Sequence, residues 1–71
     1  MKLESKYYID NRNRIMEFKH FKVIQRSDTY FGVCDRFGVE ITSDKTFNGA
    51  LVKAKLLEKG YQMGFEVGSE W

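Results

Sequence analysis

Proline is absent from this chain of 71 residues, and cysteine and histidine occur once each, as Cys34 and His20. A single thiol cannot form a disulfide within the chain, so a domain of this length must be stabilised by packing alone. One cysteine and one histidine show no metal-ligand spacing either. We therefore predict a domain without a metal site or a cofactor.

Long apolar runs, linkers and blocks of like charge are also missing. No segment approaches the roughly 20 apolar residues of a membrane-spanning helix, which argues against a membrane partner. Without a Gly/Ser-rich or highly charged stretch to divide it, the chain predicts one domain over residues 1–71. The free thiol and the lack of an apolar N-terminal segment favour a cytoplasmic location.

Hydrophobic residues make up 42% of the chain and include six Phe, four Tyr and one Trp, which provide material for a core. The net charge of +2 is unevenly distributed. Residues 1–26 carry seven basic and three acidic side chains, whereas residues 27–71 carry five basic and seven acidic ones. The basic first third is typical of an anion-binding surface, and more often of an ordinary hydrated face.

Two segments carry the same turn signal, an apolar run followed by Asp, two further residues, and then Asn or Gly. They extend from Asp10 to Asn13 and from Asp35 to Gly38, and each predicts a hairpin with a type I turn closed by a left-handed residue. The predicted cross-strand pairs are Tyr8 with Met16, Ile9 with Ile15, Val33 with Ile41, and Cys34 with Glu40. The last of these pairs would point away from the core.

The segment between the hairpins has no single strand parity. Its four apolar residues divide between the two faces, with Met16 and Phe18 on one parity and Phe21 and Val23 on the other. A regular strand cannot bury all four, so we predict a bulge or bend near Lys19-His20. A short helix over residues 14–21 is the alternative, and the pattern alone does not separate the two.

The apolar spacing is helical after residue 43 and later becomes alternating. One stripe contains Phe47, Ala50, Leu51, Ala54 and Leu57, and it predicts a helix over residues 43–59, capped by Ser43-Asp44 and ended by Gly60. Glu58 falls near this stripe, close enough to the predicted helix end for its carboxylate to reach water. Residues 61–67 alternate large apolar side chains with small or polar ones, which predicts a final half-buried strand.

These elements predict an α+β domain with the order β-β-β-β-α-β, in which an antiparallel sheet of about five strands packs on a single helix. The predicted core combines the apolar faces of the strands with the helical stripe. Its members are Ile9, Ile15, Phe18, Phe21, Val23, Phe31, Val33, Val39, Ile41, Phe47, Leu51, Ala54, Leu57, Tyr61, Met63, Phe65 and Val67.

The only candidates for paired acid–base and nucleophilic chemistry are His20 and Cys34, which could meet across adjacent strands. No third group that would orient them is evident, and the aspartates are explained as turn or cap residues. The chain contains no phosphate-loop or dinucleotide fingerprint. We therefore expect no catalytic residues and no enzymatic activity.

Surplus apolar side chains favour a role in protein binding. Val52 and Leu56 form a second apolar pair on the helix, about half a turn from the main stripe. With Tyr8, Tyr30 and Trp71, they exceed what a two-layer domain hides easily. We predict a non-enzymatic module that occupies the surface of a partner protein, or of a second copy. Small domains without motifs are common among accessory and inhibitor proteins of phages and mobile elements, and this analogy is compositional.

Nucleic-acid binding is the second hypothesis. Residues 18–22 interleave aromatic and basic side chains, as single-strand binders do when they stack bases and follow phosphates. The contact residues would be Arg12, Arg14, Lys19, His20 and Lys22. Against this, strand parity already requires the two phenylalanines of this segment in the core, with the lysines pointing outward.

Overall fold

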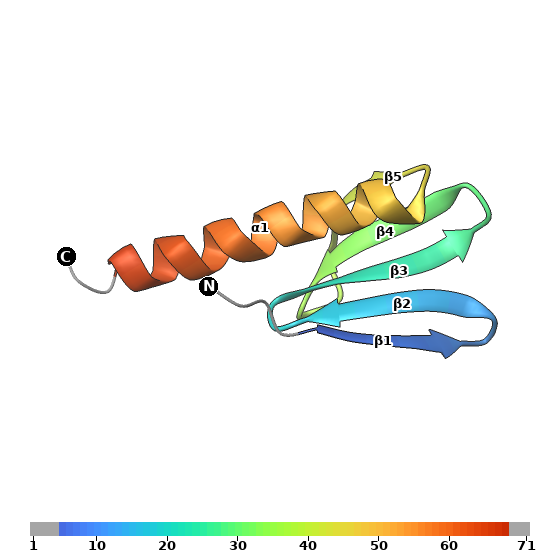
Figure 1. The fold of residues 1–71 in the computed structure, drawn as a ribbon, viewed down its shortest axis with the longest axis horizontal. Helices are drawn as coiled ribbons and strands as arrows, with labels where there is room; N and C mark the ends of the chain where they lie inside the picture. Colours follow the sequence, from blue (N-terminus) through green and yellow to red (C-terminus); the bar gives the residue numbers. More distant parts are fainter. Residues whose placement is uncertain (1–4, 69–71) are drawn as a thin grey trace.

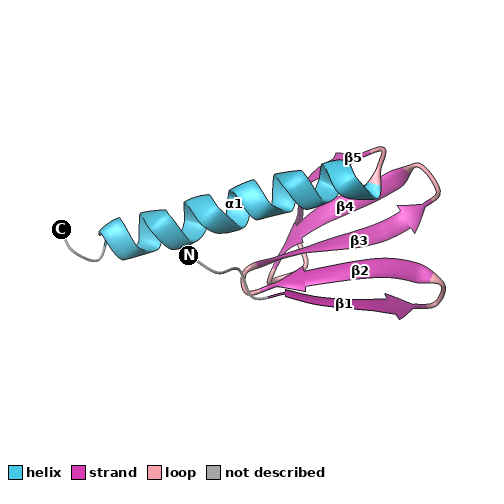
Figure 2. Ribbon diagram, in the orientation of Figure 1, coloured by secondary structure: helices cyan, strands magenta, loops and turns pink. Residues whose placement is uncertain are grey.

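Five antiparallel strands form one open sheet, and a single helix follows them and packs on the sheet (Figures 1 and 2). The computed structural model describes residues 5–68, and the side chains of residues 5–62. The strands pair in chain order. The elements are β1 (Ser5–Asp10), β2 (Asn13–Phe18), β3 (Phe21–Ser27), β4 (Tyr30–Asp35), β5 (Glu40–Asp44) and α1 (Phe47–Gly68). The predicted α+β class, an antiparallel sheet packed on one helix, is confirmed.

The order of the elements along the chain differs from the prediction, because residues 61–67 are helical and all five strands precede α1. Gly60 does not end the helix, since its φ is not in the left-handed region. Tyr61 lies three residues after Glu58 and four after Leu57, so it continues the helical stripe as well as the alternating pattern. The predicted core residues Met63, Phe65 and Val67 have side chains outside the described part.

The segment predicted as one irregular strand, in which the apolar residues have conflicting parities, forms the two strands β2 and β3. Lys19 and His20 form a two-residue reversal between β2 and β3, and the pairing continues on both sides of it from Glu17 opposite Lys22. The predicted position of the irregularity is correct, but it is a chain reversal between two strands and not a bulge or bend within one, and the alternative helix over residues 14–21 is wrong. The reversal turns Met16 and Phe18 of β2 and Phe21 and Val23 of β3 toward α1, which resolves the conflict.

The first hairpin is shifted by one residue from its predicted register. Its turn has positive φ at Asn11 (52°) and Arg12 (67°), with no such value at Asn13. Two left-handed central residues give a turn whose twist matches that of the flanking strands. The turn places Tyr8 opposite Ile15 and Ile9 opposite Arg14. The predicted burial of Ile9 is wrong, because it lies on the edge strand β1 while α1 packs mainly on β3, β4 and β5.

The turn of the second hairpin forms as predicted. The Asp35 Oδ1 atom accepts hydrogen bonds from the N–H groups of Phe37 (2.9 Å) and Val39 (3.0 Å), and Gly38 has a φ of 87°. Cys34 pairs with Glu40, but a bulge then places Val33 opposite Thr42 instead of Ile41. The extra residue disrupts the alternation of β5. Val39 and Ile41 are therefore exposed, and their predicted burial is wrong.

The core lies between α1 and the helix-facing side of the sheet. Ala50 and Ala54 have small side chains that let α1 approach the strands closely. The buried strand residues of this cluster are Phe18, Val23, Phe31 and Val33, with Met16, Phe47, Leu51 and Leu57 packed around them. Ile15 and Phe21 are buried as well, as predicted, whereas Tyr61 is not.

Cys34 is fully buried, although the prediction placed it on an outward face. It lies on the side of the sheet opposite α1, between Lys22 and Glu40 on the neighbouring strands. The Arg26 guanidinium reaches to 4.0 Å from its sulfur. Long polar side chains cover this thiol, which is why an outward parity does not expose it.

The helix begins three residues later than the predicted cap, because Ser43 and Asp44 belong to β5. Thr46 caps α1 through its hydroxyl oxygen, which accepts a hydrogen bond from the Gly49 N–H at 3.0 Å. Asp44 supports this start by accepting from the Thr46 N–H at 3.0 Å and by pairing with Lys53 at 3.2 Å. These hydrogen bonds, first the one from Thr46, lower the pKa of the Asp44 carboxyl.

Replacement of Gly60 by Ala tests the helical state of this position. A Cβ atom there would meet nothing within 4 Å. We expect Gly60→Ala to raise the free energy of unfolding by about 0.5–1 kcal/mol in urea titrations, the usual preference for Ala inside a helix. Gly49→Ala is the matched control, and it should destabilise the protein because its methyl group would collide with the Asp44 carboxylate. A loss of stability at Gly60, as for a left-handed helix cap, would contradict the continuous helix.

Candidate functional site

Three distant segments meet at one end of the sheet. The β2–β3 turn and the β4–β5 turn are neighbours there, because Phe21 pairs with Asp35. Helix α1 crosses the sheet and continues past this end (Figure 1). His20, Phe21, Arg36, Phe37, Ile41 and Tyr61 surround the junction, and we refer to these six residues as the turn-end site.

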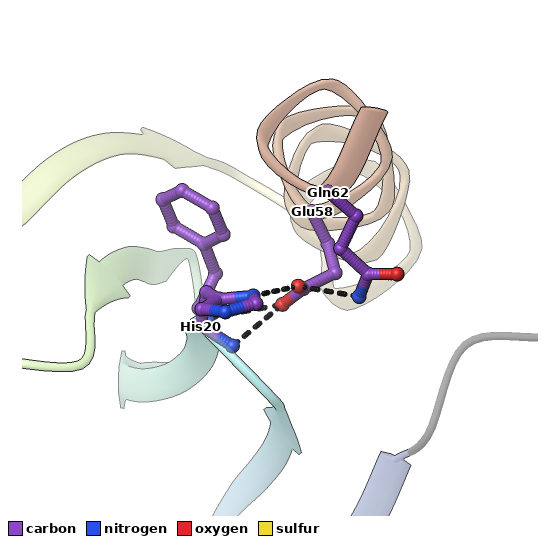
Figure 3. A network of polar contacts seen from close by, with 4 residues as sticks. His20, Glu58 and Gln62 are labelled. Carbon is purple, nitrogen blue, oxygen red and sulfur yellow. Dashed lines mark hydrogen bonds and ion pairs between the residues drawn. The ribbon is translucent and has the colours of Figure 1, made fainter. Parts of the chain in front are cut away.

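The Glu58 carboxylate holds this junction together. It has no exposed surface, although the sequence predicted that it would reach water. One oxygen accepts hydrogen bonds from the backbone N–H groups of His20 (2.7 Å) and Phe21 (3.2 Å). The other accepts from the His20 Nδ1 atom and from the Gln62 amide at 2.8 Å (Figure 3). The β2–β3 turn therefore docks on the carboxylate and excludes water from it.

Four donors make the burial of this charge tolerable. A buried carboxylate without partners would cost several kcal/mol, but each Glu58 oxygen has two. Burial by itself raises the pKa of Glu58. The hydrogen bonds from the His20 ring, the Gln62 amide and the His20 backbone, with the charge of His20, outweigh it and leave the pKa below its ordinary value of 4.5.

His20 connects this buried carboxylate to the surface. Its Nδ1 atom faces Glu58, while its ring packs against the Tyr61 ring with centroids 4.2 Å apart. Phe21 meets the same tyrosine edge to face at 6.0 Å. Tyr61 is held between two rings, yet 43% of its surface remains exposed. The contacts fix the orientation of an aromatic group that faces solvent.

A hollow of about 210 Å³ lies beside Tyr61. Its walls are the turn-end site together with Asp35, and most of them are aromatic or aliphatic. Phe37, at the tip of the β4–β5 turn, is 77% exposed, and the Arg36 guanidinium lies 5.0 Å from its ring centroid. Pockets for drug-sized ligands span roughly 300–1,000 Å³, so this hollow matches a single side chain better than a cofactor.

Basic side chains outnumber acidic ones in a depression that adjoins the hollow. Lys19, Lys22 and Arg36 line this depression of about 100 Å³ together with one acid, Glu17. Within residues 5–62, none of these three cations has a carboxylate within 4 Å. The nearby acids are engaged elsewhere, because Asp35 accepts from its own turn and Glu17 accepts from the Tyr8 hydroxyl at 2.9 Å.

The residues predicted to form a protein interface do not share one surface. Val52 and Leu56 lie exposed on α1, at 56% and 65%. Tyr8 and Tyr30 lie on the sheet face opposite α1, as the strand pairing shows. Trp71 lies outside the described residues.

The sheet face opposite α1 satisfies its own polar groups. The Tyr8 hydroxyl donates to Glu17, which raises the pKa of Tyr8, and the Tyr30 hydroxyl donates to Glu40 at 2.5 Å. Arg26 lies 3.8 Å from the same Glu40 carboxylate. These contacts are typical of an ordinary hydrated face, because the tyrosine hydroxyls already donate hydrogen bonds to glutamates on neighbouring strands.

The structure brings together only some of the predicted nucleic-acid contacts. Arg12 precedes β2 and Lys19 follows it, so about 20 Å of strand separates them. Arg14 points to the helix side and lies 5.6 Å from the Phe47 ring centroid, whereas Lys22 alternates with the core residues of β3 and faces the other side. His20 is engaged with Glu58. Lys19, His20 and Lys22 line the depression beside the hollow, whereas Arg12 and Arg14 lie away from it, so the five residues form no continuous groove.

The predicted meeting of His20 and Cys34 does not occur in a cleft, because the thiol has no exposed surface and lies on the other side of the sheet. Among the side chains of residues 5–62, no three from His, Cys, Asp or Glu lie close enough together to hold a metal ion. Over residues 5–68, α1 lacks the apolar length that a bilayer crossing requires.

The turn-end site was not predicted, although the sequence contains two signals of it. Phe37 follows Arg36 in the turn that Asp35 and Gly38 define, and an aromatic residue at a hairpin tip has no core to enter. Glu58 at an apolar helix position was the second signal, but its partners lie 37 and 38 residues away in the sequence. Comparison with protein-family models, characterised proteins and solved structures finds no match for the chain.

Glu58→Gln tests the importance of the buried carboxylate. The amide keeps the size of the side chain but loses the charge and one acceptor, so at least two of the four donors lose a partner. We expect a loss of about 2–4 kcal/mol in the free energy of unfolding at pH 7. The control is Glu17→Gln, an exposed glutamate on β2, which should change stability by less than about 1 kcal/mol.

The pH dependence of the difference in unfolding free energy between the natural protein and Glu58→Gln provides a second test. Because the folded-state pKa of Glu58 lies below 4.5, its stabilisation is fully present above that pH and is lost as the pH falls through the folded-state value. The stability gap between the natural protein and Glu58→Gln should narrow on acidification. A gap that stays constant from neutral pH into the acid range would contradict the stabilised carboxylate.

Proposed function

We propose that this chain is a non-enzymatic binding module that acts by occupying the surface of a partner protein. One observation carries the proposal: Phe37, Ile41 and Tyr61 expose 77%, 49% and 43% of their surface around a common hollow. Contiguous exposed apolar groups on a small domain mark interaction sites. Aromatic residues and arginine, both present here, are also the residues that contribute most to protein interfaces.

The rigidity of these side chains supports the proposal. Tyr61 is packed against His20 and Phe21, and His20 is held by Glu58. The Phe37 turn is closed by the hydrogen bonds to Asp35 and by the Asp35 N–H donating to the Val39 carbonyl at 2.9 Å. A preformed surface loses little conformational entropy when a partner binds.

The exposed pair Val52 and Leu56 on α1 supports the same class of function. It provides a second apolar contact, for the partner or for another copy of the chain. Protein binding is favoured over nucleic-acid binding because Arg12 and Arg14 lie away from the other three predicted contacts, and because the exposed apolar side chains surround a hollow that matches one side chain. An accessory or inhibitory role, like that of small proteins of phages and mobile elements, suits a domain that presents such a surface.

Site-specific photo-crosslinking in the cells that produce the protein tests this function. We expect a benzophenone amino acid in place of Phe37 to give a discrete heavier adduct whose second component is a protein. The matched control carries the same group at Asp28, an exposed position in the turn between β3 and β4. Because this turn lies at the other end of the sheet, it should give no such adduct.

The mass of the adduct identifies the class of partner. A second copy of the 8.4 kDa chain would make the module a homodimer and would still support protein binding. Adducts that nuclease removes, equal labelling at Asp28 and Phe37, or no adduct at either Phe37 or Leu56 would each contradict the proposal.

A further inference from the structure

We propose that the hollow at the turn end receives one large apolar side chain from an acidic segment of the partner, with the carboxylates of that segment placed against Arg36, Lys19 and Lys22. This inference rests on the proposed function and assigns the chemistry that the site recognises. It follows from the shape of the hollow, the charges at its rim and the fixed positions of its walls.

The shape of the hollow selects a single apolar group. Phe21, Phe37, Ile41 and Tyr61 provide carbon surfaces on several sides of a space of about 210 Å³. A leucine or phenylalanine side chain that enters it would exchange water for aromatic contacts. Interfaces commonly concentrate their binding energy in such an anchor seated in a pocket.

The basic side chains next to the hollow, which we call its rim, favour negative charge beside that anchor. Arg36 and Lys19 are exposed and Lys22 is half-buried, and no carboxylate among residues 5–62 lies within 4 Å of them. The acids of this end already have partners, since Glu58 is buried under His20, Asp35 holds its own turn, and Glu17 accepts a hydrogen bond from the Tyr8 hydroxyl. An acidic partner would therefore find available cations, whereas a basic partner would meet like charges.

The walls are in place before any partner binds. Glu58 fixes His20, and His20 fixes the exposed Tyr61 on one side of the hollow. On the other side, the Asp35 turn fixes the backbone of Phe37, and the Arg36 guanidinium lies against the Phe37 ring. Small-molecule and side-chain pockets with preformed walls bind without a large ordering cost.

Peptide titrations followed by amide chemical shifts test this recognition on the full chain. The probe is a capped pentapeptide with central Phe flanked by two Asp and two Glu residues. One control peptide has central Ala, and another keeps Phe but has four Lys flanks. We expect the acidic Phe peptide to shift the amides of His20, Arg36, Phe37 and Tyr61. Each control should bind about tenfold more weakly, in line with the loss of an anchor or of charge complementarity.

Two variants separate the contributions of anchor and charge. Phe37→Ala should weaken binding of the acidic Phe peptide about tenfold, since it removes one wall of the hollow. Arg36→Gln should reduce the preference for acidic over lysine flanks, and added salt should reduce it in the natural protein. Both residues are exposed, so neither change threatens the fold. Ile9→Ala, which removes an exposed apolar side chain on the edge strand β1, is the matched control and should leave peptide binding unchanged.

The outcomes distinguish this inference from the proposed function. No shift at the turn end up to about 5 mM acidic Phe peptide, well above the range of a single-anchor contact, would overturn the inference. Equal binding of the acidic and basic peptides, or shifts centred on Val52 and Leu56, would also overturn it. If Phe37 nevertheless crosslinks to a protein, the proposed protein-binding function stands with a different mode of recognition. If Phe37 gives no crosslink either, both the proposed function and this inference are wrong.

Discussion

The buried Glu58 carboxylate is the contact on which the arrangement of this domain depends. A single helix covers one side of a five-stranded sheet and continues past its end, where few strand residues remain to pack against it. Glu58 provides the missing attachment by accepting two backbone N–H groups of the β2–β3 turn and the His20 ring. The His20 and Phe21 N–H groups thereby donate to a side-chain acceptor from α1, and the same hydrogen bonds fix the position of α1 over the turn. Without this contact, neither His20 nor Tyr61 would have a fixed orientation.

This contact also explains how a small core coexists with exposed aromatic side chains. The apolar cluster of Phe18, Val23, Phe31 and Val33 against Ala50 and Ala54 uses the first part of α1. The helix beyond Ala54 holds its position through Glu58, and Tyr61 is thereby presented at the surface beside Phe37. Buried ion pairs contribute less to stability than apolar packing of equal volume, but they can select one geometry among several. Here, the selected geometry is the hollow with its cationic rim.

Local chemistry was predictable from the sequence, and contacts between distant segments were not. The Asp35–Gly38 turn and the helical stripe from Phe47 to Leu57 were predicted correctly because each is encoded within a few residues. The alternating apolar pattern of residues 61–67 predicts a strand, but so short a run also fits a helix, and in the structure Tyr61 packs on His20 from within α1. The bulge that exposes Ile41 has no signature of its own. The turn-end site escaped prediction because it joins a turn, a hairpin tip and a helix that are far apart in the chain.

Amide hydrogen exchange at His20 and Phe21 tests the central claim most directly. Both groups lie in or next to a two-residue turn at the end of a sheet, where amides ordinarily exchange by local fluctuation. If they donate to a buried carboxylate, their exchange should require an opening that approaches global unfolding, and Glu58→Gln should abolish most of that protection. Exchange as fast as at the exposed Asn11-Arg12 turn would contradict the account.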